Sequence, residues 1–465
     1  MPPVPRLALR ACCLPLAGFL LAGCTSFAPQ GGRESVRQSV LQKTGLTLER
    51  AGRPPDAGPA AIPGADDAVR LALTGNPRVA AILAELDAAD AQAVQASLLR
   101  NPFLHAGYQY PRSGQGRALD AGLSWDLLGL LSLKPRREAA DQVRAAARQN
   151  AVAGILELAA RSRAAWYAHL ADRESADLLA DQVEAADLVA EIAGRLEQAG
   201  NLPPQATARA RVARLDARYV LEDATLAARA SLARLAGLLG VDDPGQLRLP
   251  AHLPRLPAAD PAVPDPTALE AADLRLASLT AELERARRQL DAAHRTAWTD
   301  GLEVGWTWSR ETDGAWQDGP SVGVSLPFFD TGTARQAGIR AEVAQREARI
   351  AERRLALGRE ARDAARRMQQ ARGRVESLRE GLLPLLADAQ DEALLQYNAM
   401  QLGTFGLLDL KQRELATVRQ LVQALADYWQ ARTALEALKL GVGLGADDTP
   451  RPLQLAQPAG QTGGH

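Results

Sequence analysis

The chain has 465 residues, with 54 Lys and Arg against 55 Asp and Glu and a formal net charge of −1. Its length and its 47% hydrophobic content suffice for a large core, and the balanced charge gives no reason to expect nucleic acid as a partner. The five His are scattered, and the sequence holds no phosphate loop, dinucleotide fingerprint or nucleophile elbow. We therefore expect no enzyme, no cofactor and no metal site.

Residues 1–23 have the order of a secretory leader, because Arg6 and Arg10 precede an apolar run that is too short to span a bilayer. The residues Leu21-Ala22-Gly23-Cys24 then match the bacterial lipobox. We expect cleavage before Cys24 and acylation of its thiol; the alternative is cleavage elsewhere, with the thiol left unmodified.

The other two cysteines, Cys12 and Cys13, lie inside the expected leader, so a disulfide or a cysteine-based metal site is excluded in the mature chain. Thr25 follows the lipobox cysteine, and the resemblance to lipoproteins without Asp there implies sorting to the outer membrane. Residues 24–65 are rich in Pro and Gly and indicate a lipidated arm or linker, in which 34–48 could form a short helix.

Helices are expected wherever proline is absent over long stretches and apolar residues recur at helical spacing. In chain order they cover about 66–99, 136–198, 205–239, 267–298, 334–400 with a kink at Pro384, and 407–440. The helix over 136–198 would be about 95 Å long, more than a compact domain of this size accommodates. A stripe such as Leu421, Leu425 and Tyr428 favours helix against helix in the manner of a coiled coil.

Four short segments between these helices alternate apolar residues with small or polar ones, as strands do. They cover about 102–110, 118–127, 301–310 and 320–328, with hairpin loops at 111–117 and 311–319. Each approaches the roughly 9 to 11 residues of a membrane-crossing strand, and Trp125, Trp306 and Trp308 lie on the apolar faces near segment ends, as in the aromatic girdles of membrane barrels. The alternative is one face of a soluble antiparallel sheet. Four strands cannot close a barrel in lipid, so the membrane interpretation requires oligomerisation.

The order helix, strand, strand, long helix, turn and helix occurs twice, which indicates an internal duplication. We assign the first repeat to 66–240, a proline-rich linker to 241–265, the second repeat to 266–445 and a disordered tail to 446–465. Phe103 lies about 199 residues before Leu302, and Gly200 lies 203 before Gly403.

The sequence resembles the TolC-type outer-membrane efflux family over nearly the whole mature chain. The motifs that carry the resemblance are Ala72-Leu73-Thr74-Gly75-Asn76-Pro77, Leu99-Arg100-Asn101-Pro102, Ser325-Leu326-Pro327-Phe328-Phe329-Asp330-Thr331-Gly332, Tyr397-Asn398-Ala399-Met400-Gln401-Leu402-Gly403-Thr404 and Leu407-Leu408-Asp409. The resemblance implies a mainly α fold with a small β part. It also implies a homotrimer that closes a twelve-stranded outer-membrane β-barrel, continued by a periplasmic α-helical barrel.

The resemblance also implies partners: outer-membrane lipid, a periplasmic adaptor (membrane fusion) protein and an inner-membrane pump of the resistance-nodulation-division type. It places adaptor binding at the periplasmic tip, which here comprises Gly200, Asn201, Leu202, Gly403, Thr404, Phe405, Leu407 and Leu408. The alternative for Gly200 and Gly403 is a purely structural role, as left-handed caps that end long helices.

Asp409 matches a position whose carboxylates line the constricted tip and act as a gate. The second acidic position of that motif is Gln412 here, which puts a double acidic ring in doubt. The alternative role of Asp409 is that of a charge favoured by the dipole at a helix N-terminus.

From these features we expect a passive exit duct of a tripartite efflux pump, for heavy-metal cations or small toxic compounds. The region 34–48 and the absence of a Gly-Pro-Asp-Tyr arm resemble cation and copper efflux members. Two alternatives remain at this point: an exit duct for type I protein secretion, and a non-conducting periplasmic lipoprotein built as a structural coiled coil.

Overall fold

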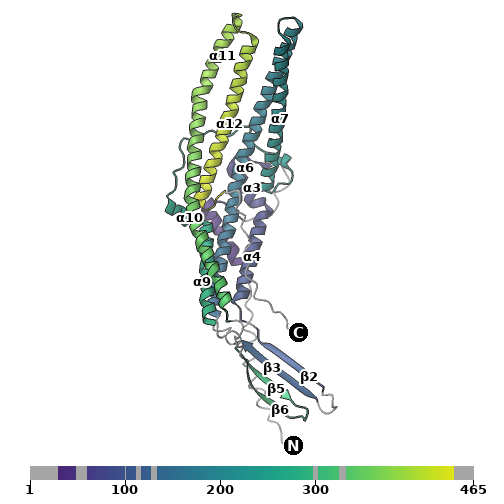
Figure 1. The fold of residues 1–465 in the computed structure, drawn as a ribbon, viewed down its shortest axis with the longest axis vertical. Helices are drawn as coiled ribbons and strands as arrows, with labels where there is room; N and C mark the ends of the chain where they lie inside the picture. The colour runs from purple at the N-terminus through teal and green to yellow at the C-terminus, as the bar shows by residue number, and fades with distance from the viewer. Residues whose placement is uncertain are drawn as a thin grey trace.

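The computed structural model describes residues 30–48, 60–99, 101–110, 117–126, 133–296, 302–323 and 331–444. The expected leader, Cys24 and the tail 446–465 lie outside these ranges. The molecule is long, with a small sheet at one end and the turns between its longest helices at the other (Figure 1). In the described part, no helix combines the length and the apolar character that a membrane span requires. The expected fold class, mainly α with a small β part, is confirmed.

The helices account for most of the described chain. They are α2 (Gln30–Thr44), α3 (Ala65–Gly75), α4 (Pro77–Ser97), α6 (Leu133–Gln198), α7 (Pro204–Leu239), α8 (Pro266–Ala272), α9 (Leu274–Thr296), α10 (Thr333–Glu376), the π-helical turn η2 (Ser377–Leu382), α11 (Leu383–Asn398) and α12 (Thr404–Leu440). With 66 residues, α6 is about 100 Å long. The π-turn η2 ends two residues before Pro384, whose ring lacks the N–H that a regular helix needs.

Each repeat starts with two helices where the sequence pattern predicts one. In the first repeat the break is at Asn76, because Pro77 excludes the helical conformation there and the Asn76 side chain accepts a hydrogen bond from the Arg78 N–H (2.8 Å). In the second repeat the break is at Asp273, whose carboxylate caps α9 through the Leu276 N–H (2.6 Å).

The two repeats also end alike, in a left-handed glycine packed against that break. Gly240 (φ +72°) follows α7, and a Cβ on it would come within 2.8 Å of the Asn76 Cα. Gly441 (φ +94°) follows α12, and a Cβ there would come within 2.0 Å of the Ala272 carbonyl oxygen. Only glycine fits at either position, so the end of each repeat is fastened to its beginning.

The sheet contains four antiparallel strands in the order β2-β3-β5-β6. They are β2 (Phe103–Gln109), β3 (Ala118–Asp126), β5 (Glu303–Arg310) and β6 (Trp316–Gly323). The last strand begins four residues earlier than the sequence predicts, because a short turn that includes Gly314 (φ +89°) closes the hairpin between Glu311 and Ala315. The expected continuation of this strand to residue 328 lies outside the described residues.

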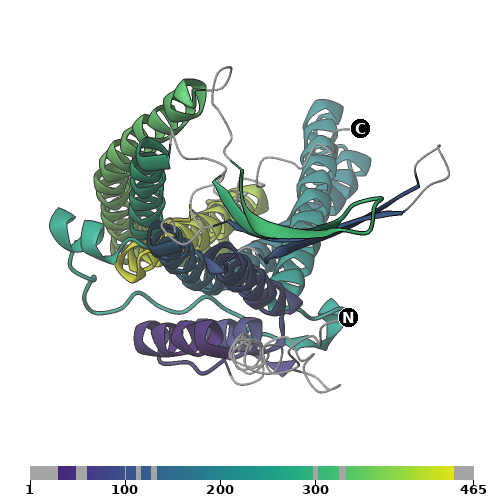
Figure 2. The ribbon, with the colours of Figure 1, turned by 90° about the horizontal axis from the view of Figure 1, so that it is seen from below.

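The largest core cluster is centred on the first repeat and extends to the second. Leu73, Ile155 and Leu235 are fully buried there, and the Tyr167 ring stacks on that of Trp429 with a centroid distance of 4.8 Å. Viewed from below, α2 and the linker between the repeats lie on the same side of a curved helical layer (Figure 2).

Both of these outer segments are attached to the layer. The linker contains η1 (Pro244–Gln246) and β4 (Leu247–Arg248), which pairs in parallel with β1 (Ala60–Ala61). Further along the linker, Asp260 accepts hydrogen bonds from Arg372 of α10 and from the Tyr428 hydroxyl (2.7 Å). The N-terminal helix α2 is held by Lys43, which donates to the carbonyl of Leu440 (2.8 Å).

Candidate functional site

The four-stranded sheet has one apolar and one polar face, as the alternating sequence predicts. Cross-strand register places Leu104, Leu123, Trp306 and Val322 among the apolar set, and the Leu104 side chain is 70% exposed. Apart from Phe103, which lies opposite Ser124, the other face carries small and polar residues: His105, Gly107, Gln109, Asp120, Gly122, Ser124, Asp126, Glu303, Gly305, Thr307, Ser309, Gln317, Gly319, Ser321 and Gly323. The apolar face is therefore uncovered by any other part of the described chain, which is the reverse of a soluble sheet packed on its core.

Polar groups on the apolar face gather at its far end, near the β5–β6 turn. The Trp306 ring donates to Asp318 through Nε1 (3.3 Å), and the Arg310 guanidinium lies 5.8 Å from the centroid of the Trp316 ring. Aromatic rings beside charged groups at the edge of an apolar band are typical of the boundary between hydrocarbon and water.

The predicted tip residues lie in two turns at the end of the molecule opposite the sheet (Figure 1). In the first turn Gly200 has φ +72°, and the Asn201 N–H donates to the Leu196 carbonyl (2.8 Å), which closes the end of α6. Gly200 and Asn201 are exposed, and Leu202 is half-buried. Gly200 is thus a left-handed helix cap, as one of the two alternatives predicted.

The second turn differs from that prediction, because its left-handed residue is Met400 (φ +60°) rather than Gly403. The Gln401 N–H donates to the Gln396 carbonyl (2.9 Å), so Met400 occupies the place that Gly200 has in the first turn. Gly403 has φ −79° and is the N-cap residue of α12. The corresponding positions of the two turns are therefore 200 residues apart, and the offset of 203 taken from the glycines is wrong.

The remaining predicted tip residues lie in the first turn of α12, which begins at Thr404. Phe405, Leu407 and Leu408 are half-buried. The side chain of Leu402 lies against this turn, since a Cβ on Gly406 would come within 2.6 Å of its Cδ1.

Asp409 lies in the second turn of α12 and is more than half exposed. Its carboxylate accepts a hydrogen bond from Arg413 Nε at 3.0 Å, one helical turn away. The sequence pattern did not single out Glu414, which accepts from Lys411 Nζ (2.7 Å) and from Gln390 Nε2 of α11 (2.9 Å). These two hydrogen bonds lower the Glu414 pKa, so its carboxylate stays ionised and connects α11 to α12.

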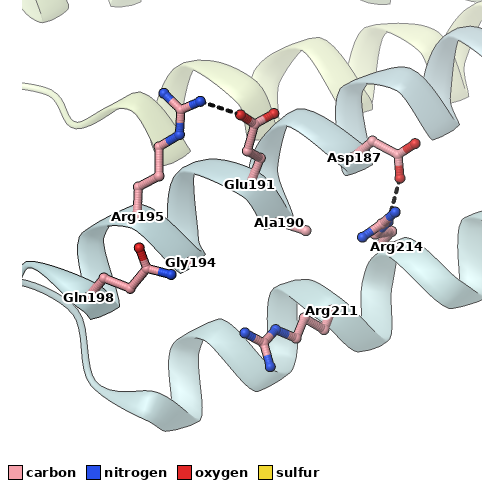
Figure 3. A pocket seen from close by; sticks show the side chains of 8 residues that line it. All are labelled: Asp187, Ala190, Glu191, Gly194, Arg195, Gln198, Arg211 and Arg214. Atoms are coloured by element: carbon pink, nitrogen blue, oxygen red, sulfur yellow. Dashed lines mark hydrogen bonds and ion pairs between the residues drawn. The ribbon is translucent and has the colours of Figure 1, made fainter.

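A charged groove of about 580 Å³ runs between α6 and α7 beneath the first turn. Figure 3 shows Arg211 on α7, Asp187 paired with Arg214, and Arg195 paired with Glu191. The distance between Arg214 Nε and the Asp187 carboxylate is 2.6 Å. The groove is polar and exposed, with both signs of charge along its walls. Among the described residues, no group of three His, Cys, Asp or Glu is placed to hold a metal ion.

Comparisons with known proteins agree with this architecture. The chain is 27% identical over 391 residues to the cobalt-zinc-cadmium resistance protein CzcC of Cupriavidus metallidurans, an alignment that covers 82% of this chain and 90% of that protein. No protein-family model matches the chain.

Several of the similar solved structures are described as outer-membrane or transmembrane channels. CmeC, the outer membrane channel of Campylobacter jejuni, superposes with a TM-score of 0.66 and 16% identity over 82% of this chain and 87% of that chain. CusC, whose structures concern transmembrane channel formation, superposes with a TM-score of 0.65 and 17% identity over 82% of this chain and 92% of that chain. The resemblance indicated by the sequence motifs is thereby confirmed, and the chain has the fold of the TolC-type outer-membrane channels.

Proposed function

We propose that this protein is the outer-membrane exit duct of a tripartite efflux pump, through which substrates pass without any reaction on the chain. One observation carries the proposal: a sheet with an uncovered apolar face and a polar opposite face stands at the end of a helix about 100 Å long. Such a face is stable in lipid and unfavourable in water. The long helices extend the same molecule away from the bilayer.

The active form would be a homotrimer. The described sheet ends in two edge strands, β2 and β6, which run in opposite directions and so can pair antiparallel between neighbouring copies. Hydrocarbon offers no partner for the N–H and C=O groups of an open edge, so closure is required. Three copies of four strands give the twelve-stranded barrel that the resemblance implies.

The helices provide a second surface for the same assembly. On α7, the exposed side chains of Val212, Leu215 and Tyr219 recur at spacings of three and four, as in a coiled-coil seam. On α11, Leu385 and Leu395 are each about two-thirds exposed. Because α7 and α11 form opposite edges of the helical layer in both views (Figures 1 and 2), α7 of one copy would meet α11 of the next and close a ring.

Partner binding would take place at the two tip turns, with Gly200, Asn201, Leu202, Gly403, Thr404, Phe405, Leu407 and Leu408 facing a periplasmic adaptor protein. Their position at the end farthest from the sheet supports this, because an inner-membrane pump of the resistance-nodulation-division type has to be reached from there. Asp409 would gate the tip, and its pairing with Arg413 leaves its carboxylate exposed. Disulfide cross-linking of a Cys introduced at Asn201 to an adaptor tests this assignment, and Cys in place of the exposed Val263, in the linker between the repeats, is the control.

The substrates would be divalent transition-metal cations. This proposal rests on the similarity to CzcC, whose name describes resistance to cobalt, zinc and cadmium. A strain lacking the gene should accumulate more zinc than its parent, whereas accumulation of an organic dye should be equal in the two strains. Equal zinc contents would contradict this substrate class.

The chain would be anchored by acyl groups on Cys24 in the outer membrane. Five residues lie between Cys24 and the start of α2 at Gln30, so the two are at most about 22 Å apart along the chain. Arg33 of α2 pairs with Asp87 on α4, the helix that leads into β2, so α2 starts on the membrane side of the helical layer. Cys24→Ser should abolish incorporation of labelled fatty acid, and persistent labelling would refute the anchor.

Ion conductance in planar bilayers tests the duct itself. The purified protein should migrate as a heat-labile trimer and conduct potassium ions. A trimer that does not conduct would favour the structural coiled-coil lipoprotein instead.

A further inference from the structure

One histidine and one carboxylate approach each other on the polar face of the sheet. His105 on β2 and Asp120 on β3 lie diagonally across the strand pair, with 3.4 Å between His105 Nε2 and Asp120 Oδ2. Gly122 stands directly opposite His105 in register, and a Cβ there would come within 2.3 Å of the imidazole Cε1. The imidazole ring therefore lies over Gly122, and only glycine leaves room for it to reach Asp120.

The separation of these two atoms suits a transition metal. Zinc binds histidine nitrogen and carboxylate oxygen at about 2.0 to 2.2 Å, so two corners of a tetrahedral zinc site are about 3.4 Å apart. Imidazole nitrogen is a good ligand for zinc and its neighbours in the transition series and a poor one for magnesium or calcium. The two side chains are 40% and 48% exposed, which leaves the other coordination positions open to water.

A purely structural role explains this pair poorly. An ion pair as exposed as this one contributes little to stability. A second pair, His252 with Glu174 at 3.2 Å, differs because the Glu174 carboxylate also accepts the Leu253 N–H and so fastens the linker. Within the described chain, the side chains of His105 and Asp120 form hydrogen bonds or ion pairs only with each other.

We propose that His105 and Asp120 form a weak, transient binding site for divalent transition-metal cations on the wall of the conduit. The inference rests on the proposed function, since the polar face lines a conduit only if the apolar face meets lipid. Two protein ligands suit conduction better than three or four, because a permeating ion has to leave as readily as it enters. The carboxylates of Asp126 and Glu303 on the same face add negative charge that raises the local cation concentration.

The experiment measures potassium current through the purified trimer in planar bilayers while zinc or cadmium chloride is added. Either metal should reduce the current reversibly, a chelator should restore it, and magnesium at the same concentration should have no effect. His105→Ala and Asp120→Asn should each shift the half-effect concentration upward by about tenfold or more, as the loss of a group at a metal site does. Gly122→Ala keeps both ligands but displaces the imidazole ring, so it should produce the same shift.

His252→Ala is the matched control and should respond to zinc like the unaltered protein. A heat-labile trimer and normal potassium current establish that each variant is folded. If zinc does not change the potassium current of the unaltered protein, the inference is overturned, whereas the proposed duct function is still supported. A zinc effect that persists in all three sheet variants would also overturn it, because the metal would then bind elsewhere. Absence of any current would refute the duct and this site together.

Discussion

Replacing Asp273 with Ala should destabilise the second repeat strongly, because this carboxylate has two roles. Asp273 is 1% exposed, it caps α9 through the Leu276 N–H, and it accepts from Arg353 Nη2 at 2.8 Å. Loss of an N-cap costs about 1 kcal/mol. Removing one partner of a buried ion pair costs about 3 to 5 kcal/mol, and the lower figure applies because Glu360 remains 3.1 Å from Arg353. We expect a loss of about 4 kcal/mol in total.

Two further variants separate the roles of this carboxylate. Asp273→Asn keeps the cap and removes the charge, so it should lose about 3 kcal/mol. The double variant Asp273→Ala with Arg353→Met has no unpaired buried cation and should lose only about 1 to 2 kcal/mol. Urea unfolding in detergent, followed by circular dichroism, gives the three values. If the double variant is less stable than Asp273→Ala alone, the ion-pair argument is refuted.

Three other predictions concern the tip, the helical core and the linker. Met400→Gly should raise the free energy of unfolding by about 1 kcal/mol, because glycine has no Cβ penalty at φ +60°, and Gly200→Ala should lower it by a similar amount. If urea titrations give both changes the same sign, the assignment of these two caps is contradicted. Burial and, to a lesser extent, the nearby Arg173 lower the pKa of His169 below 6.5, so the unfolded chain binds the proton first and the protein should become less stable as the pH drops below that value. His169→Gln should reduce this pH dependence of stability, and an unchanged slope would rule His169 out as its source. Tyr428→Phe should lower the free energy of unfolding by about 1.5 kcal/mol, because it removes the hydroxyl that donates to Asp260 at 2.7 Å. Thermal unfolding at matched detergent concentration measures the change, and no change would show that this linker contact is unimportant.

The strands and the long helices could be predicted from the sequence because each depends on a local period. Alternation assigns every second residue to one face, so Leu123 and Trp125 had to lie together once the segment was a strand. The absence of proline over 136–198 predicted one long helix, and α6 covers it completely.

The sequence pattern did not predict the two helix breaks, at Asn76 and Asp273, of which one has a local cause and the other a distant one. At Asn76 the signal was local, since an Asn-Pro pair is an N-cap followed by a favoured first helical residue. At Asp273 no proline follows, and the break is stabilised by Arg353, which lies 80 residues later in the chain. No window of the sequence around Asp273 contains that partner.

The second tip turn was misassigned because glycine was taken as the mark of a left-handed residue. The helix α11 ends at Asn398, and the left-handed residue that follows it is Met400, three residues before Gly403. Counting 200 residues back from Ala399 and Leu402 gives Ala199 and Leu202, so a match over the whole turn would have found the correct alignment. The approach of His105 to Asp120 depends likewise on strand register, which alternation alone leaves open.

The contacts within one protomer and the surfaces that it leaves uncovered divide the molecule into two parts. The buried ion pair of Asp273 with Arg353 and the closures at Gly240 and Gly441 each lie within one repeat, and the stacked rings of Tyr167 and Trp429 join the two repeats. The apolar sheet face, the two edge strands, and the exposed stripes on α7 and α11 are left without partners inside the described chain. Each of these surfaces is costly in water, and lipid with two further copies would cover all of them. The protomer is therefore shaped at its centre by its own contacts, and in the proposed trimer its sheet and helix edges would be stabilised by assembly.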